Sequence, residues 1–246
     1  MPSSRLRISD AWLSVMRESF VAEIDAIAGA IFNRVLPVFD SVNEEAERVE
    51  QQEWDRRGQL WSEDEGDPAA DAEHARDLAV DYLLTMERVK QGTLNLLGAG
   101  LYHLVEQQML RFLRCGVLGA GEEHRARSDD NWGRLVSLSE LKRRLNDEGV
   151  DLASLQSWSA IEQLQLFANT VKHAEGWSYE KLFEQRPDLF VHPWERDAGD
   201  PTPRSGPLYQ PLFGQGLYLS GAQFGIFVEQ AKSFWVDLAA ALEATR

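Results

Sequence analysis

Apolar residues recur every three or four positions along most of this chain, which is the spacing of one face of an α-helix. The last segment shows this period most clearly, because eight apolar residues follow it from Phe224 to Leu242. Ser220 stands just before the segment, where a serine side chain can cap a helix N-terminus. We therefore predict a core-facing amphipathic helix near the C-terminal end of the sequence.

A first helical segment is predicted over about residues 9–60. Its apolar stripe runs from Trp12 to Val35 at helical spacing. Pro37 is expected to kink this segment or to end it at the preceding residue, because proline lacks the N–H that a helix interior needs. Beyond Pro37 the segment is rich in glutamate and poor in apolar residues, so we expect a solvated helix there.

A second long segment, about residues 70–114, is predicted to be one helix or a pair of helices. Its apolar stripe runs from Leu78 to Phe112. Gly98 and Gly100 weaken its middle, each by about 1 kcal/mol relative to alanine. Small residues at this point would also let another helix approach closely.

Shorter helices are predicted for the part of the chain that follows. They cover about residues 138–146, 152–173 and 179–185, and Asp151 is placed to cap the middle one. The polar stretch Glu122–Arg134 carries no apolar stripe, so we expect it to be a surface loop.

The stretch Pro187–Ser220 holds six of the nine prolines and is predicted to be mostly loop. Apolar residues flank the sequence Phe213–Gly216, which favours a small β-hairpin within this stretch. Trp194 stands among the prolines and would either pack within the loop or dock a partner. Packing within the loop is the interpretation we favour.

No other part of the sequence alternates as a β-strand does, and no repeat of solenoid period is present. We therefore predict an all-α fold, an up-and-down helix bundle of four to five main helices. Its first and second helices are long, and a proline-rich loop precedes its last helix. The chain is predicted to form a single helical domain over residues 1–246, with surface loops at 62–69 and 187–220.

The composition bounds the class of protein. The chain of 246 residues carries 25 Lys and Arg against 40 Asp and Glu, a net charge of −15, which disfavours an overall nucleic-acid-binding surface. Cys115 is its one cysteine, so no intramolecular disulfide can form. The N-terminus lacks the apolar run of a signal peptide, and no membrane span is expected, so we predict a cytoplasmic protein. The acidic stretch 44–67 is interpreted as a solubilising surface, with a partner-binding surface as the alternative.

No motif in the sequence indicates a metal or a cofactor, and none is predicted. The five histidines are scattered, no His-Glu-x-x-His occurs, and no cysteine and histidine have zinc-site spacing. The glycine-rich stretch Gly116–Gly121 lacks the lysine and the preceding strand of a phosphate-binding loop.

One group of polar residues remains as a candidate site. Asn169, Lys172 and His173 are related by i, i+3 and i+4 near the end of a predicted helix, so their side chains share one face. A histidine titrates near neutral pH, and a lysine can hold a phosphate oxygen. Such a set can deprotonate a ribose hydroxyl and stabilise the charge that develops at phosphorus. The alternative is structural, because the helix dipole favours cations in a last turn.

The order of elements resembles the HEPN superfamily: long paired helices, a helix that bears Asn-x-x-x-His near its end, a loop and a final amphipathic helix. The motif match is Asn169 and His173. The family's signature also has an arginine before the asparagine, and Ala168 stands there in this chain. Lys172 would replace that charge from the other side of the motif. The resemblance implies an all-α bundle that forms a homodimer, in bacterial defence or toxin–antitoxin systems. The segment from Phe167 to His173 also resembles a pattern in uncharacterised bacterial proteins.

Two hypotheses of function follow from the resemblance. In the first, which the missing arginine and the acidic charge favour, the chain is a non-catalytic binding or regulatory module whose acidic surface meets a basic protein partner. Asn169 and His173 then hold the loop after their helix, and His173→Ala lowers stability. In the second, the chain is a metal-independent ribonuclease, with His173 as general acid or base and with Asn169 and Lys172 on the phosphate. RNA is a partner only in this second case.

Overall fold

The computed structural model describes residues 8–59, 67–128, 131–197, 202–203 and 206–246, and all that follows concerns these residues. Their regular structure is entirely helical, and none of them lies in a β-strand. The predicted all-α bundle with two long early segments is confirmed.

The first segment is helical up to the proline that was expected to interrupt it. Its stretches differ in pitch, because wider π-helical turns alternate with α-helix. Pro37 lies in a final 3₁₀ turn, and a new helix starts after the turn at Asp40 and Ser41, so the predicted interruption is confirmed. The stretches are α1 (Asp10–Ser14), a π-helix (Val15–Phe20), α2 (Val21–Ala30), a π-helix (Ile31–Val35), a 3₁₀ turn (Leu36–Phe39) and α3 (Val42–Gly58).

The second segment is one continuous helix, α4 (Pro68–Phe112), followed by a π-helical turn over Leu113–Val117. Its 45 residues correspond to about 67 Å at the usual rise per residue. The Asp67 side chain accepts hydrogen bonds from two backbone N–H groups of the first turn, and Pro68 fills a position where no N–H is needed. Gly98 does not break the helix, because Phe167 and Leu219 pack against it where a Cβ would stand.

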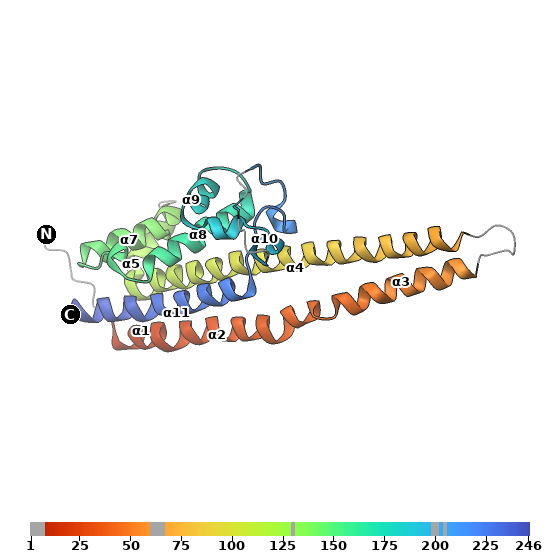
Figure 1. Cartoon of the computed structure of the whole chain (residues 1–246). Helices are drawn as coiled ribbons and strands as arrows, with labels where there is room; N and C mark the ends of the chain where they lie inside the picture. Colours follow the sequence, from red (N-terminus) through yellow and green to blue (C-terminus); the bar gives the residue numbers. More distant parts are fainter. Residues whose placement is uncertain (1–7, 60–66, 129–130, 198–201, 204–205) are drawn as a thin grey trace.

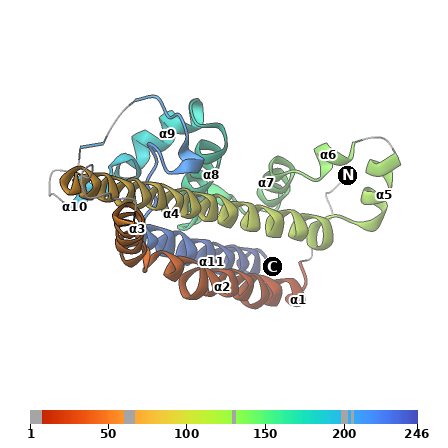
Figure 2. The ribbon, with the colours of Figure 1, turned by 90° about the vertical axis from the view of Figure 1, so that its right-hand side faces the viewer.

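Helix α4 joins two parts of the molecule (Figure 1). α3 and the first part of α4 lie antiparallel and project as a two-helix arm, which we define as residues 42–58 and 68–84. The rest of α4 runs through the helical bundle, which we call the body. Figure 2 shows α8 and α9 on one side of α4 and α1, α2 and α11 on the other. α4 is thus the central element of the fold.

The remaining helices complete the body. The helix α7 and the C-terminal α11 match their predicted positions, and Ser220 forms a reciprocal capping box with Gln223. Asp151 caps only a short 3₁₀ turn over Leu152–Ser154, and the predicted third-region helix starts later. The helices are α5 (Ala120–Ser128), α6 (Trp132–Leu135), α7 (Leu138–Asp147), α8 (Trp158–His173), α9 (Trp177–Gln185), α10 (Pro193–Asp197) and α11 (Gly221–Ala244).

The core of the body is aromatic and surrounds one buried amide. Phe20 and Trp235 lie with ring centroids 4.5 Å apart, and both are fully buried. The Trp235 indole N–H donates to the Gln108 side-chain oxygen at 2.7 Å, and the Gln108 amide donates to the backbone oxygen of Phe20 at 3.2 Å. These bonds satisfy polar groups that would otherwise be costly to bury, and they join α4, α11 and the first segment.

The predicted surface loop over Glu122–Arg134 is wrong, because α5 and α6 occupy it. Arg127 stacks over the Trp132 ring at 4.0 Å and pairs with Glu123 at 3.1 Å. Local charge pairs at i, i+4 and one aromatic anchor therefore form short helices without an apolar stripe.

The predicted hairpin before α11 is also wrong. Residues Pro211–Phe213 form a 3₁₀ turn, and the following residues up to Ser220 run irregularly along α4. The backbone of this stretch is bonded by side chains of α4 rather than by a second strand. The stretch 187–220 contains two more short helices, a 3₁₀ turn over Pro187–Phe190 and α10.

Candidate functional sites

Asn169, Lys172 and His173 all lie in the last turns of α8, as the sequence predicts. Asn169 is half-buried, whereas Lys172 and His173 are exposed. The helix ends at His173 because Ala174 adopts a positive φ of 59°, and its N–H donates to the Thr170 oxygen at 2.9 Å. The three residues therefore share a helix end, at the start of the loop to α9.

Little in the surroundings orients this group. In the parts of the chain that the structure describes, the side chains of Asn169, Lys172 and His173 make no hydrogen bond or ion pair. The imidazole of His173 has no carboxylate to fix its tautomer there. The three clefts described below are lined by other residues.

The largest of these clefts has a volume of about 870 Å³ and lies where the arm joins the body. One wall is the middle of α4, with Glu87, Arg88 and Lys90. α10 and the residues that precede it form another part of the lining, and the segment Gly214–Gly221 completes the cleft up to the N-terminus of α11. We refer to it as the junction cleft.

Three rings gather on one side of the junction cleft. His192 lies edge-on to Trp194 at 5.7 Å and to Tyr218 at 4.8 Å, between ring centroids. Trp194 remains 62% exposed. Trp194 therefore packs against His192 of its own loop, as the favoured interpretation expects, while much of its side chain stays exposed.

Two amide side chains of α4, Asn95 and Gln91, hold the stretch before α11 in place beside the junction cleft. The Asn95 side chain donates to the backbone oxygens of Pro211 and Leu217, both at 2.8 Å, and its oxygen accepts from the backbone N–H of Leu219 at 3.3 Å. Gln91, one turn earlier, donates to the Leu219 oxygen at 3.0 Å and to Asn95 at 3.1 Å. Two side chains of α4 thus replace the strand pairing that this stretch lacks.

Arg196 connects α10 to the backbone at Asp188 and at Tyr218, beside the same cleft. Its guanidinium donates to the backbone oxygens of Asp188 at 2.8 Å and of Tyr218 at 2.5 Å. Asp188 in turn pairs with Arg186 at 2.8 Å. Burial of the Asp188 carboxylate raises its pKa, but hydrogen bonds from Arg186 and Gln223 outweigh this and leave the pKa below its ordinary value. The cleft wall is therefore held by bonds to charged groups.

A second, smaller cleft of about 350 Å³ lies on the arm, between α3 and the start of α4. Glu47, Glu50 and Trp54 line it. We refer to it as the arm groove. Next to it, hydrogen bonds from Arg56 and Arg57 lower the pKa of Glu53 to about 2, so this carboxylate stays ionised.

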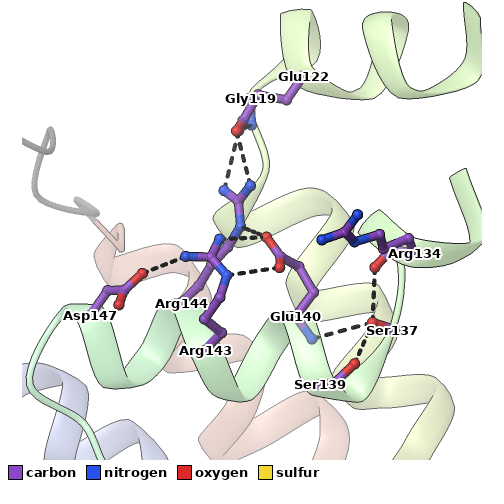
Figure 3. A network of polar contacts seen from close by, with 9 residues as sticks. All are labelled: Gly119, Glu122, Arg134, Ser137, Ser139, Glu140, Arg143, Arg144 and Asp147. Carbon is purple, nitrogen blue, oxygen red and sulfur yellow. Dashed lines mark hydrogen bonds and ion pairs between the residues drawn. The ribbon is translucent and has the colours of Figure 1, made fainter. Parts of the chain in front are cut away.

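A third cleft, of about 330 Å³, lies among α5, α6 and α7 beside a network of arginine–carboxylate pairs (Figure 3). Glu140 accepts from Arg143 and Arg144, both at 2.7 Å, and Arg144 also reaches Glu122 at 2.9 Å. Hydrogen bonds from Arg143 are the main reason that the pKa of Glu140 falls to about 2, and burial acts in the opposite direction. This network joins α5 to α7. The charged residues beside the third cleft are therefore explained by the packing of these helices and need no ligand.

No family model, no curated protein and no solved structure matches this chain. Within the described ranges, no three His, Cys, Asp or Glu residues are grouped so that they could hold a metal ion. None of the described helices is both long enough and apolar enough to cross a bilayer.

The junction cleft contains functional candidates that the sequence reasoning missed. Arg88 and Lys90 carried no motif, and Tyr218 had been assigned to a hairpin. The one available signal was Trp194, a large aromatic residue in a stretch rich in proline. Its neighbours in space come from α4 and from the residues before α11, which lie about a hundred and about twenty-five positions away.

Proposed function

We propose that the protein is a non-catalytic binding or regulatory module, with HEPN-like helical architecture, whose acidic arm engages a basic protein partner. The observation that carries this proposal is the concentration of charge. The two arm helices, residues 42–58 and 68–84, hold ten acidic and four basic residues, a net of −6 out of −15 for the whole chain. These helices project from the body (Figure 1), so their charges are accessible to a partner.

The arm groove is the part of this surface best shaped for a basic side chain. Glu47 and Glu50 are exposed, and neither forms a hydrogen bond or an ion pair through its side chain with any other described residue. Trp54 lines the same groove. An arginine or lysine would meet two free carboxylates and an indole there, which is a favourable setting for a cation.

The candidate residues of α8 support a non-catalytic function. The arginine of the HEPN signature is absent, and no side chain in the described chain bonds His173 to orient it. A general base needs a fixed tautomer and a fixed direction, which second partners normally supply. We place the module in a bacterial defence or toxin–antitoxin setting and propose that it forms a homodimer, as the family resemblance implies.

The arm proposal is tested with a fluorescent octa-arginine peptide and fluorescence anisotropy at physiological salt. The double variant Glu47→Gln and Glu50→Gln is expected to weaken binding by about tenfold, because two free charges at the groove are lost. The matched control is Glu18→Gln with Glu162→Gln, which removes the same charge from exposed positions of the body. An equal loss in both double variants would mean that only the net charge of the chain matters, and would end the proposal.

A metal-independent ribonuclease is the second candidate, and the exposure of Lys172 and His173 favours it. Its test is incubation of the protein with total RNA in the presence of EDTA. Our proposal predicts no cleavage by the wild type. Cleavage that His173→Ala abolishes, and that His124→Ala on α5 leaves unchanged, would replace the binding module with the nuclease.

A further inference from the structure

The junction cleft differs from the rest of this acidic protein in charge. Its lining has three basic side chains, Arg88, Lys90 and Arg196, against two acidic ones, Glu87 and Glu195. We infer that the junction cleft binds a small planar aromatic anion. This inference goes beyond the proposed function and uses no residue of the arm groove.

The aromatic part of the ligand is inferred from the three rings. Trp194 lines the cleft and is 62% exposed, and His192 lies edge-on both to Trp194 and to Tyr218. An exposed indole held by a neighbouring ring is a platform on which another planar ring can stack. A flat ligand would cover apolar surface that is otherwise in water.

The anionic part of the ligand is inferred from the α4 side of the lining. Arg88 and Lys90 are exposed, and within the described chain their side chains have no hydrogen-bond or ion-pair partner. Their charges are therefore available to a carboxylate or a phosphate. The N-terminal end of α11 opens at the same cleft through Ser220 and Gly221, and it adds partial positive charge.

The cleft is also built before any ligand arrives. Asn95 and Gln91 fix the segment up to Leu219, and Arg196 ties α10 to Tyr218. A preformed site loses little conformational entropy on binding. A volume of about 870 Å³ falls within the range of about 300–1,000 Å³ that small-molecule sites have.

A ring with an anionic group can come from an aromatic carboxylate or from a nucleoside monophosphate. The probes are therefore indole-3-acetate and AMP, each titrated by isothermal calorimetry. The uncharged counterparts, indole-3-acetamide and adenosine, are titrated in parallel. We expect at least one anion to bind, and its uncharged counterpart to bind about tenfold more weakly, since the basic wall contributes. Binding of indole-3-acetate would identify the ligand class as an aromatic carboxylate, and binding of AMP would identify it as a nucleoside monophosphate.

Two variants with matched controls locate the binding. Trp194→Ala removes the platform, and its control is Trp177→Ala, a tryptophan on α9 that is 67% exposed and lies outside the cleft. Arg88→Glu with Lys90→Glu reverses the basic wall, and its control is Arg34→Glu with Arg76→Glu, which makes the same change in net charge. Each cleft variant is expected to weaken binding by about tenfold or more, and each control to leave it within about twofold.

Trp194→Phe keeps a planar ring and serves if the alanine variant fails to fold, with circular dichroism as the check. The Trp194→Phe variant is expected to bind the anion more tightly than the double variant Arg88→Glu with Lys90→Glu. The inference is overturned if neither anion binds at concentrations up to about 5 mM, the level of very weak affinity. It is also overturned if the control variants lose binding as the cleft variants do.

Discussion

At the scale of single residues, a few side chains determine where irregular backbone lies. Asn95 is fully buried and satisfies two carbonyls and one N–H of the stretch before α11. Glu140 has a comparable position in the network of α5 and α7, where it accepts from two arginines. A buried or half-buried polar side chain with several hydrogen-bond partners stabilises the folded state only while its charge or its geometry is kept.

The depressed pKa of Glu140, about 2, predicts how stability responds to acid. In the unfolded chain this carboxylate has its ordinary pKa of 4.5 and protonates first. Protons therefore favour the unfolded state as the pH falls from about 4.5 toward 2, and the contribution of Glu140 is fully present only above this window. Glu140→Gln should lower the free energy of unfolding at pH 7 by about 1 kcal/mol and reduce its fall below pH 4.5.

This pH dependence is measured by urea denaturation at several pH values from 7 to 3. Glu162→Gln is the control, because Glu162 is exposed and lies away from the network. A variant at position 140 whose acid sensitivity equals that of the wild type would show that the network does not contribute to stability.

At the scale of elements, α4 accommodates its glycines for different reasons. A Cβ at Gly92 would stand 2.3 Å from the backbone oxygen of Leu212, so the loop can approach α4 only because this side chain is absent. A Cβ at Gly100 would meet no atom within 4 Å. The same residue type is therefore required at one position of the helix and only costs helix propensity at the other.

Alanine substitutions at these two glycines should have opposite effects. Gly92→Ala is expected to destabilise the protein by about 2 kcal/mol or more, because backbone must move. Gly100→Ala should stabilise it by up to about 1 kcal/mol, since alanine is the better helix former. Thermal and urea denaturation measure both, and destabilisation by Gly100→Ala or no effect of Gly92→Ala would contradict the packing described.

At the scale of the whole molecule, the arm and the body differ in how much they bury. In the arm, the buried side chains of α3 are Val42 and Ala46, and those of the first part of α4 are Ala75 and Ala79. The body instead buries a continuous aromatic core. Small side chains bury little apolar area, so the arm gains little stability from packing.

Hydrogen exchange should therefore distinguish the two parts. We expect backbone amides of α3 and of α4 up to about Leu84 to exchange at least about tenfold faster than those of α11, because local opening of the arm breaks few contacts. Mass spectrometry of peptides from both parts measures this. Equal protection in arm and body would show that the arm is stabilised by contacts not described above.

The sequence predicts the parts of the fold that depend on local chemistry. Ser220 with the apolar period after it identifies α11, and Pro37 identifies the break before α3, because caps and proline act on neighbouring residues. The helix that bears Asn169 and His173 is predicted from its apolar period, but it begins at Trp158 rather than directly after Asp151.

The features that the sequence did not predict depend on contacts between residues far apart in the chain. The stretch before α11 has the apolar alternation of a hairpin, but Asn95 bonds it from more than a hundred residues away. The junction cleft was missed because its walls come from three distant parts of the chain. The action of Asn169, Lys172 and His173 stays a prediction, since α8 places them together but no neighbouring group indicates a reaction.

The unbroken course of α4 has a mechanical consequence. Arg88 and Lys90 lie on the same continuous helix as residues 68–84 of the arm, whereas Trp194 belongs to α10. A force that bends or twists the arm must move those two cations relative to the indole. A protein bound at the tip of the arm and a small molecule bound at its base would then be coupled along the stretch of α4 from Pro68 to Arg88, which is about 30 Å long.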